Sequence, residues 1–364
     1  MLKVAIVGTT SWGTTLGIML ARKEIKVHLW ARTEREAKQL NDNGLNGAQF
    51  PGVTFPPHLH VTSHMKEALA GAKAVILAVP SQSIRQNIEL VESHLTKSTI
   101  VISAAKGLEL GSSKRMSQVI QEVINPNFST NICVLSGPNL SREILHELPA
   151  ASVVAAENNR VARQIQRILS TPYFCIFTNT DVIGVELGGA FKNIIALGAG
   201  IADGLGYGDN AKAAFMTRGL TEITALGVAL GANPLTFSGL AGLGDVITTC
   251  ASPLSRNHYV GVELAKGHSL TEIVDSMTEV AEGVTTTLVA RNLAQQMGLE
   301  MPITEKIYQV LYEDAEPSLI TEGLMRFNAK HELEGRKWRL FSFFQRRNSP
   351  PRNRKGTHNA SKKP

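Results

Sequence analysis

Residues 2–32 read LKVAIVGTTSWGTTLGIMLARKEIKVHLWAR, and this stretch decides the fold. A β-branched run leads into a loop with Gly8 and Gly13, then into a segment that can form a helix, and then into a second apolar run. That order is the context of a dinucleotide-binding fingerprint, in which the first glycine makes the tight turn and the last lets the helix pack on its strand. The middle position is Thr10, whose side chain we expect to crowd a pyrophosphate unless the loop moves outward or the hydroxyl contacts a phosphate.

Beyond residue 32 the alternation continues through the first half of the chain. The runs AKAVILAV, STIVISAA, NICVLSG, ASVVAA and YFCIF are each followed by a helix-like segment. This pattern predicts an α/β fold of parallel βαβ units with helices on both faces of the sheet. After about Thr180 the sequence becomes Ala/Gly/Leu-rich with helical spacing. We therefore predict a Rossmann-like parallel-sheet domain over 1–180, an all-helical C-terminal domain over 181–329, and a polar, disordered tail over 330–364.

The net charge of +6 belongs to the tail. Residues 330–364 contain 11 Lys or Arg and 2 Asp or Glu, so the remaining 329 residues carry 26 bases against 29 acids. A slightly acidic globular part offers no general field for a phosphate backbone, which argues against nucleic acid as a partner. The segment RKWRLFSFFQRR at 336–347 allows at most a weak membrane-surface contact, and a dispensable solubilising tail is the alternative.

Other features of composition indicate a cytoplasmic protein. The three cysteines, Cys133, Cys175 and Cys250, lie far apart without metal-ligand spacing, so we expect three small core residues in a reducing compartment and no zinc site. We find no apolar run near the roughly 20 residues that span a bilayer. The first residues lead directly into a strand instead of a signal core.

The end of the second predicted strand indicates which dinucleotide is bound. An NAD-specific site usually has an acidic residue there, whereas this chain has Arg32, with Arg35 one helical turn later. Two guanidinium groups suit a 2′-phosphate, so we expect NADP(H) to be accepted alongside NAD(H). The alternative is that both arginines belong to a solvated helix start.

Two lysines are candidates for chemistry. Lys106 follows a predicted strand, in AAKGLE, and would point into the crevice at the carboxyl edge of the sheet, as would the turn at Gly137. Lys192 lies in GGAFKN, on a helix that is apolar nearly all round. Burial should lower the pKa of such an amine, so that it could exchange a proton with a substrate hydroxyl. A buried lysine paired for structure is the alternative, and Asn193, Asp203 or Asp209–Asn210 could support either network.

A third cluster suits a phosphate group. The glycine-rich segment FSGLAGLGD ends in Asp245 and reads as a flexible turn. Ten residues later, Ser255, Arg256 and Asn257 stand at a predicted helix start, where a hydroxyl, a guanidinium and helix amides would meet a phosphate monoester. A helix N-cap followed by a surface arginine is the alternative.

The chain closely resembles the bacterial type of NAD(P)-dependent glycerol-3-phosphate dehydrogenase over residues 1 to 325. The resemblance rests on GTTSWGT, PGVTFPPHLHVTS, AVILAVPSQSIR, AAKGLE, ELGGAFKNIIALGAGIADGLGYGDNAKAAFMTRGL, FSGLAGLGDVITTC and SRN. It implies reversible hydride transfer between glycerol 3-phosphate and NAD(P)+, giving dihydroxyacetone phosphate, in support of glycerophospholipid synthesis. It also makes a homodimer plausible, and no metal is required.

The resemblance further implies roles for individual residues. Lys192 would be the proton acceptor and donor. The other implied substrate contacts are Lys106, Gly137, Asn139, Asp245, Ser255, Arg256 and Asn257. The implied cofactor contacts are Gly8, Ser11, Trp12, Gly13, Arg32, Arg35, Lys106, Ser141, Arg256, Val280 and Glu282. Thr10, Asn139 and Leu140 depart from the family pattern. Two other functions stay open, a related dehydrogenase of hydroxy acids or sugar acids and a nucleotide-binding protein without catalysis.

Overall fold

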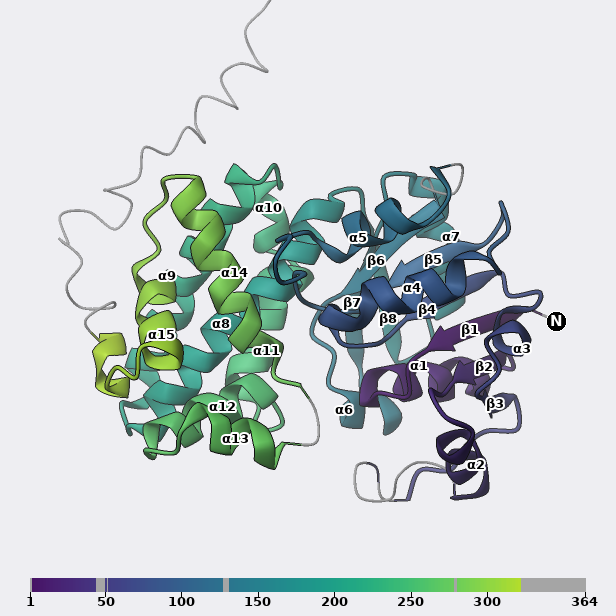
Figure 1. Ribbon diagram of the computed structural model, residues 1–364, viewed down its shortest axis with the longest axis horizontal. Coiled ribbons are helices and arrows are strands. Elements are labelled where there is room, and N and C mark those ends of the chain that lie inside the picture. The colour runs from purple at the N-terminus through teal and green to yellow at the C-terminus, as the bar shows by residue number, and fades with distance from the viewer. Residues whose placement is uncertain (1, 44–49, 51, 127–130, 278–279, 322–364) are drawn as a thin grey trace, which may run out of the picture. The chain divides into compact units, whose positions relative to one another are not determined.

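An eight-stranded sheet forms the first half of the chain in this computed structural model, which describes residues 2–43, 50, 52–126, 131–277 and 280–321 (Figure 1). Its spatial order is β3-β2-β1-β4-β5-β6-β7-β8. The strands are β1 (Lys3–Val7), β2 (Lys26–Trp30), β3 (Leu59–Thr62), β4 (Ala74–Leu77), β5 (Ile100–Ser103), β6 (Ile132–Ser136), β7 (Ala150–Ala155) and β8 (Phe174–Asn179). The predicted α/β class is thus confirmed, and β3 is a strand that the sequence pattern missed.

Strand direction differs from the prediction at one place. β1 to β6 are parallel, but β7 pairs antiparallel with β6, with Val134 opposite Ala155, and β8 is parallel to β7. The predicted parallel-sheet domain is thus confirmed, and the antiparallel pair of β6 and β7 is a detail that the sequence pattern did not indicate. Only 13 residues, with the short helix α6, separate β6 from β7, and an antiparallel neighbour needs no long crossover.

Helices cover both faces of the sheet, as expected for βαβ units. One face packs against α1 (Ser11–Arg22), α2 (Glu34–Asn43), α6 (Ser141–Leu145) and α7 (Asn159–Leu169). The other packs against α3 (Met65–Leu69), α4 (Ile84–Glu92) and α5 (Met116–Val123), and a short 3-10 helix, η1 (Ser81–Ser83), precedes α4. The inner strands β4, β5 and β6 are consequently buried on both sides, which explains their continuous apolar runs.

The described residues after β8 form helices around one central element, α8 (Val182–Gly204). The others are α9 (Gly208–Ala229), α10 (Pro234–Phe237), the π-helical turn η3 (Leu240–Gly244), α11 (Asp245–Ala251), α12 (Arg256–Ala265), α13 (Leu270–Ser276), α14 (Glu282–Gln296), α15 (Pro302–Tyr312) and the 3-10 turn η4 (Pro317–Leu319). α8 contacts α9, α11, α12, α14 and α15, so it is the core of this half.

Two expectations need correction. α8 is long and apolar enough to cross a membrane, contrary to our reading of apolar runs, but 89% of that window is buried inside the protein, as in a core helix. Cys133 and Cys250 are buried as expected, whereas Cys175 is exposed because β8 forms an edge of the sheet. The predictions for residues 330–364 lie outside the described residues.

Candidate active site

The loop between β1 and α1 has the geometry of a phosphate-binding turn. Gly8 has φ +111°, and a Cβ there would lie 2.8 Å from the carbonyl oxygen of Ala78. A Cβ on Gly13 would lie 2.2 Å from the carbonyl oxygen of Gly8, so only glycine lets α1 begin this close to β1. The turn therefore aims the N-terminus of a 12-residue helix at the carboxyl edge of the sheet, where anions bind well.

The Thr10 hydroxyl makes two hydrogen bonds within the protein. Its Oγ1 accepts a hydrogen bond from Gly13 N at 3.1 Å, which makes Thr10 the N-cap of α1, and donates to the carbonyl oxygen of Ala78 at 2.6 Å. Thr10 thus ties the loop to the end of β4. The Thr10 hydroxyl therefore has a capping role within the loop.

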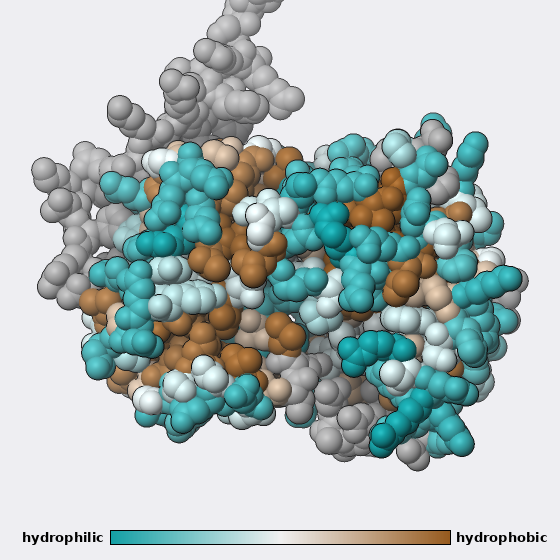
Figure 2. All heavy atoms as spheres, in the orientation of Figure 1, coloured by the Kyte–Doolittle hydropathy of each residue, from teal (hydrophilic) through white to brown (hydrophobic). Residues whose placement is uncertain are grey.

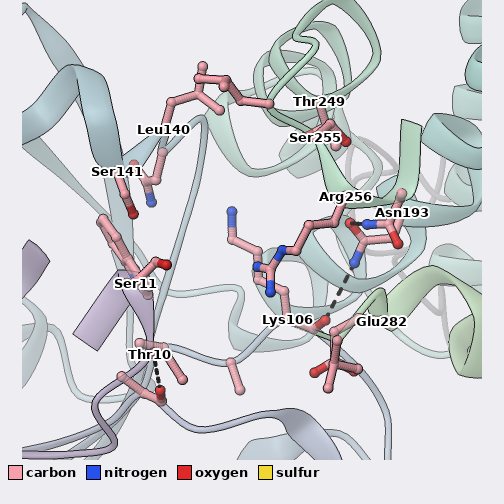
Figure 3. A pocket seen from close by; sticks show the side chains of 18 of the residues that line it. Thr10, Ser11, Lys106, Leu140, Ser141, Asn193, Thr249, Ser255, Arg256 and Glu282 are labelled. Atoms are coloured by element: carbon pink, nitrogen blue, oxygen red, sulfur yellow. Dashed lines mark hydrogen bonds between the residues drawn. The ribbon is translucent and has the colours of Figure 1, made fainter. Parts of the chain in front are cut away.

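One cavity of about 350 Å³ brings together residues from both halves of the chain (Figure 3). From the sheet half it is lined by Thr10, Ser11, Trp12, Phe50, Ala78, Val79, Pro80, Ala104, Ala105, Lys106, Asn139, Leu140, Ser141 and Arg142. From the helical half it is lined by Lys192, Asn193, Asp245, Thr248, Thr249, Leu254, Ser255, Arg256, Asn257, Val280 and Glu282. Figure 3 shows Ser11 and Ser141 on one side of this space and Ser255 and Arg256 on the other.

Two lysines share one buried carboxylate in this cavity. The side chain of Asp245 is 1% exposed. Its Oδ2 accepts a hydrogen bond from Lys106 Nζ at 2.5 Å, and its Oδ1 accepts one from Lys192 Nζ. Lys106 also donates to the carbonyl oxygen of Gly137 at 2.7 Å, and Lys192 donates to Thr249 Oγ1 at 2.6 Å. Each ammonium group has three N–H donors, so each keeps one for a bound molecule.

Burial has a clear electrostatic effect on Lys106. Desolvation lowers its pKa to about 8, the Asp245 carboxylate opposes that shift, and the neighbouring Lys192 ammonium adds to it. Two cations facing one carboxylate leave this part of the cavity positive while both lysines are protonated. Such a site favours an oxygen atom that develops negative charge.

Close packing of β6 and η3 against α8 brings Lys106, Lys192 and Asp245 together. A Cβ on Gly189 would lie 2.4 Å from Ser136 Oγ at the end of β6, and a Cβ on Gly188 would lie 2.5 Å from the carbonyl oxygen of Ala241. The predicted flexible turn before Asp245 is instead the π-helical turn η3, which runs directly into α11. Because Gly188 and Gly189 let α8 lie close to η3 and β6, Lys192 comes within reach of Asp245.

The N-terminus of α12 lies at the same cavity. The predicted helix start is confirmed, and Ser255 is its N-cap, as the alternative reading had it; the Ser255 Oγ accepts a hydrogen bond from His258 N at 3.2 Å. Asn257 is buried, and its Nδ2 donates to Asn193 Oδ1 at 2.9 Å while its Oδ1 accepts from Gly283 N at 2.9 Å. The Asn257 side chain thereby joins α12 to α8 and α14.

Among the polar partners that we considered for Lys192, only some lie nearby. Asn193 belongs to the network, because its Nδ2 lies 3.5 Å from the carbonyl oxygen of Lys106. Asp203 does not, since it pairs with His258 and Lys212. Asp209 and Asn210 are exposed at the start of α9.

Glu282 contacts the sheet half directly. It is the first residue of α14, and its carboxylate accepts hydrogen bonds from Ser81 N at 2.8 Å and Ser81 Oγ at 2.5 Å. Val280, just before it, is 49% exposed at the cavity. The hydrogen bonds of Glu282 thus connect α14 to η1, which follows β4.

Several predicted contacts lie apart from the lining residues. Gly8 and Gly13 shape the loop from behind, and Gly137 takes part through its carbonyl oxygen. Arg32 and Arg35 are exposed just after β2. Asn139, in contrast, does line the cavity, and its Nδ2 donates a hydrogen bond to Ser152 Oγ at 3.1 Å.

Sequence reasoning missed other lining residues. Thr249 lies four residues after Asp245 on α11, a helical spacing that could have revealed it. Arg142, one residue after Ser141, adds a cation to the lining. Phe50 is buried and directly precedes the segment PGVTFPPHLHVTS, but nothing in that segment assigns it to the cavity.

The residues present fit a dinucleotide. The glycine turn and the α1 N-terminus suit a pyrophosphate, and Trp12 Nε1 is buried beside them without a hydrogen-bond partner in the described structure. Within the same residues, no group of three or more His, Cys, Asp or Glu could hold a metal ion. Fold and cavity together define a Rossmann-type, dinucleotide-dependent dehydrogenase.

The comparisons identify the family. Residues 3–162 match the model for the N-terminal part of NAD-dependent glycerol-3-phosphate dehydrogenase, and residues 181–322 match the model for its C-terminal part. The chain belongs to the NAD-dependent glycerol-3-phosphate dehydrogenase family.

Similar proteins agree with this assignment. A protein of Dehalococcoides mccartyi named glycerol-3-phosphate dehydrogenase (NAD(P)+) is 60% identical over 348 residues, which cover 95% of this chain and 97% of that protein. One of the same name from Moorella thermoacetica is 47% identical, covering 92% and 99%. The crystal structure of glycerol-3-phosphate dehydrogenase from Coxiella burnetii has a TM-score of 0.84 at 34% identity, covering 90% of this chain and 99% of that one.

Proposed function

We propose that this protein is an NAD(P)-dependent sn-glycerol-3-phosphate dehydrogenase that interconverts glycerol 3-phosphate and dihydroxyacetone phosphate. The observation that carries the proposal is the pair of lysines on Asp245, in one cavity with the N-terminus of α12. A secondary alcohol that carries a phosphate needs both features, a cationic site for its oxygen and an anion site for its phosphate.

Each cation has a distinct role. Lys192 Nζ is fixed by Asp245 and Thr249, and as an ammonium it donates its third proton to the carbonyl oxygen during reduction. In the oxidation direction the neutral amine of Lys192 accepts the hydroxyl proton. Lys106 stabilises the negative charge that develops on the same oxygen. Arg256 and the amides at the start of α12 bind the phosphate, which fixes the reacting carbon in place.

We place the cofactor site at the loop between β1 and α1 and at the residues that lie around this loop. Gly8, Gly13 and the amides of Ser11 and Trp12 would hold the pyrophosphate, with Ser141, Val280 and Glu282 nearby. A bound nicotinamide dinucleotide accepts or supplies the hydride. Arg32 and Arg35 would bind a 2′-phosphate, so NADP(H) is used in addition to NAD(H).

A kinetic comparison tests the function. The purified protein should oxidise NADPH or NADH with dihydroxyacetone phosphate and not with hydroxy acids or sugar acids. Lys192→Ala should lower kcat by about 10²- to 10⁴-fold, the usual contribution of a general acid–base group. Turnover of a hydroxy acid in preference to the phosphate ester would contradict the proposal, as would NADPH binding without turnover.

The cofactor preference has its own test. Arg32→Ala should raise KM for NADPH about tenfold or more, because a charge-assisted contact to phosphate is lost, and should leave KM for NADH within about twofold. Equal changes for the two cofactors would place the 2′-phosphate elsewhere.

We extend the proposal to domains, assembly and location. Residues 1–180 would be the nucleotide-binding domain and 181–329 the substrate domain, working as a homodimer in the cytoplasm. Most exposed large apolar side chains lie after residue 181, among them Leu235, Ile247 and Val274, and Figure 2 shows much of the apolar surface of this face over the helical half. Light scattering after gel filtration tests the dimer. Vesicle binding before and after truncation at Phe327 tests the membrane contact of the tail.

A further inference from the structure

A second group of charged side chains lies at the far end of α8 from Lys192. Asp203 Oδ2 accepts a hydrogen bond from His258 Nε2 at 2.7 Å and lies 2.5 Å from Lys212 Nζ. The side chains of His258, Lys212 and Asp203 are 13%, 22% and 28% exposed. Asp203 therefore joins the end of α8 to the starts of α9 and α12.

His258 has a particular place in α12. It is the third residue of that helix, its backbone N–H is the one that the Ser255 cap accepts, and it follows directly after Arg256 and Asn257. A rotation of the first turn of α12 would therefore move the Ser255 hydroxyl and the Arg256 guanidinium together.

The backbone of His258 also rests on α8. A Cβ on Gly200 would lie 2.1 Å from the carbonyl oxygen of His258, and a Cβ on Gly261 would lie 2.1 Å from the carbonyl oxygen of Leu197. The two helices thus meet backbone to backbone. Such a contact sets their separation, and the buried side chains of Val260 and Leu264 join those of Leu197 and Ile201 in one hydrophobic cluster. Directional restraint on the first turn of α12 then comes from polar contacts.

Polar contacts supply that restraint at two points. Asn257 bonds to Asn193, next to Lys192, and the His258 ring bonds to Asp203 about three helical turns further along α8. Both anchors come from adjacent residues in the first turn of α12, so together they fix the position of that turn along α8. The second anchor lies outside the cavity lining.

We propose that His258 is a positioning residue for phosphate binding: its hydrogen bond to Asp203 sets the Arg256 end of α12 relative to Lys192. The inference rests on the proposed function, because it assigns the α12 start to the substrate phosphate. His258 itself touches no reacting atom in this scheme.

Matched variants isolate the bond. His258→Leu removes the ring donor at similar volume, whereas His258→Gln keeps a side-chain N–H near the position of Nε2. Lys212→Met serves as the control, since it removes the other partner of Asp203 and leaves the His258 bond in place. The full-length protein is used throughout, and urea unfolding of each variant separates loss of folding from loss of position.

The assay compares two substrates, dihydroxyacetone phosphate and dihydroxyacetone, which lacks the phosphate. For His258→Leu we expect kcat/KM for the phosphate ester to fall about 10- to 100-fold, mainly through KM, and the inhibition constant of inorganic phosphate to rise by a similar factor. We expect kcat/KM for dihydroxyacetone, KM for NADPH and the urea midpoint to stay near the parent values. His258→Gln and Lys212→Met should stay within about threefold of the parent on both substrates.

Two results would overturn the inference while leaving the proposed function intact. One is an equal loss on both substrates in His258→Leu, which would mean a general structural role. The other is an unchanged kcat/KM for the phosphate ester in that variant. A parent protein that turns over neither substrate would overturn the proposed function, and this inference with it.

Discussion

Lys106 Nζ lies 2.5 Å from Asp245 Oδ2, and the other oxygen of the same carboxylate accepts a hydrogen bond from Lys192. The two lysines come from different halves of the chain, one after β5 and one within α8. A single buried carboxylate therefore holds the two halves together at the point where chemistry would occur. It offsets only one of the two positive charges, so the excess is available to an anionic oxygen.

This relationship predicts a severe effect for Asp245→Asn. The variant keeps the size of the side chain but leaves two buried lysines without their carboxylate. Removing one partner of a buried ion pair lowers the free energy of unfolding by about 3–5 kcal/mol. Because neither lysine is then held in place by the carboxylate, kcat/KM for dihydroxyacetone phosphate should also fall, by at least about 10²-fold. Asp275→Asn, an exposed change on α13, is the matched control and should have no effect. Near-parent turnover in Asp245→Asn would show that the carboxylate is dispensable.

The pKa of Lys106 predicts the pH dependence of reduction. Burial is the largest cause of the shift and lowers this pKa to about 8, so Lys106 is an ammonium below pH 8 and loses its charge above it. Because the charged form stabilises the developing oxyanion, kcat/KM for dihydroxyacetone phosphate should fall about tenfold per pH unit above 8. Lys106→Arg keeps the charge at all accessible pH values, and its profile should lack that descending limb. A limb that persists in Lys106→Arg would belong to another group.

The sequence predicts local features of this protein well. The turn around Gly8 and Gly13, the burial of Lys192 and the cap at Ser255 each depend on a few neighbouring residues. Such features follow from backbone sterics, helix periodicity and capping preferences, which act over one or two turns.

Features that depend on distant pairing were less predictable. β7 is antiparallel to β6 because of the path that the chain takes after α6. A β-branched run indicates a strand but not whether that strand pairs parallel or antiparallel with its neighbour. The partner of Asp203 also escaped prediction, because α12 lies more than 50 residues away in sequence. Phe50 reaches the cavity by a tertiary contact alone.

Thr10→Val tests the capping role of Thr10. Valine keeps the branched Cβ but removes both the acceptor for Gly13 N and the donor to the carbonyl oxygen of Ala78. We expect the free energy of unfolding to fall by about 1–2 kcal/mol and the Kd for NADPH to rise severalfold, because the α1 amides lose their fixed orientation. Thr217→Val, an exposed change on α9, is the control for urea unfolding and NADPH fluorescence titrations. Tighter NADPH binding in Thr10→Val would indicate crowding by the threonine instead.

His28 predicts a loss of stability in acid. It lies on β2 and is 7% exposed, and its Nδ1 has no hydrogen-bond partner in the described structure. Burial, with smaller effects from the charges of Lys3, His60 and Lys26, lowers its pKa from 6.5 to about 4. Between these two values the unfolded chain binds a proton that the folded protein excludes, so stability falls as the pH falls through this range.

The size of that effect can be measured with a neutral substitute. The depressed pKa of His28 corresponds to roughly 3 kcal/mol of stability lost between pH 6.5 and 4. His28→Gln does not titrate, so its unfolding free energy should decline less over this range than that of the parent. Urea titrations at half-unit pH steps provide the comparison, with the exposed His146→Gln as the control that should follow the parent curve. Parallel curves for parent and His28→Gln would mean that His28 takes up its proton equally in the folded and unfolded chain.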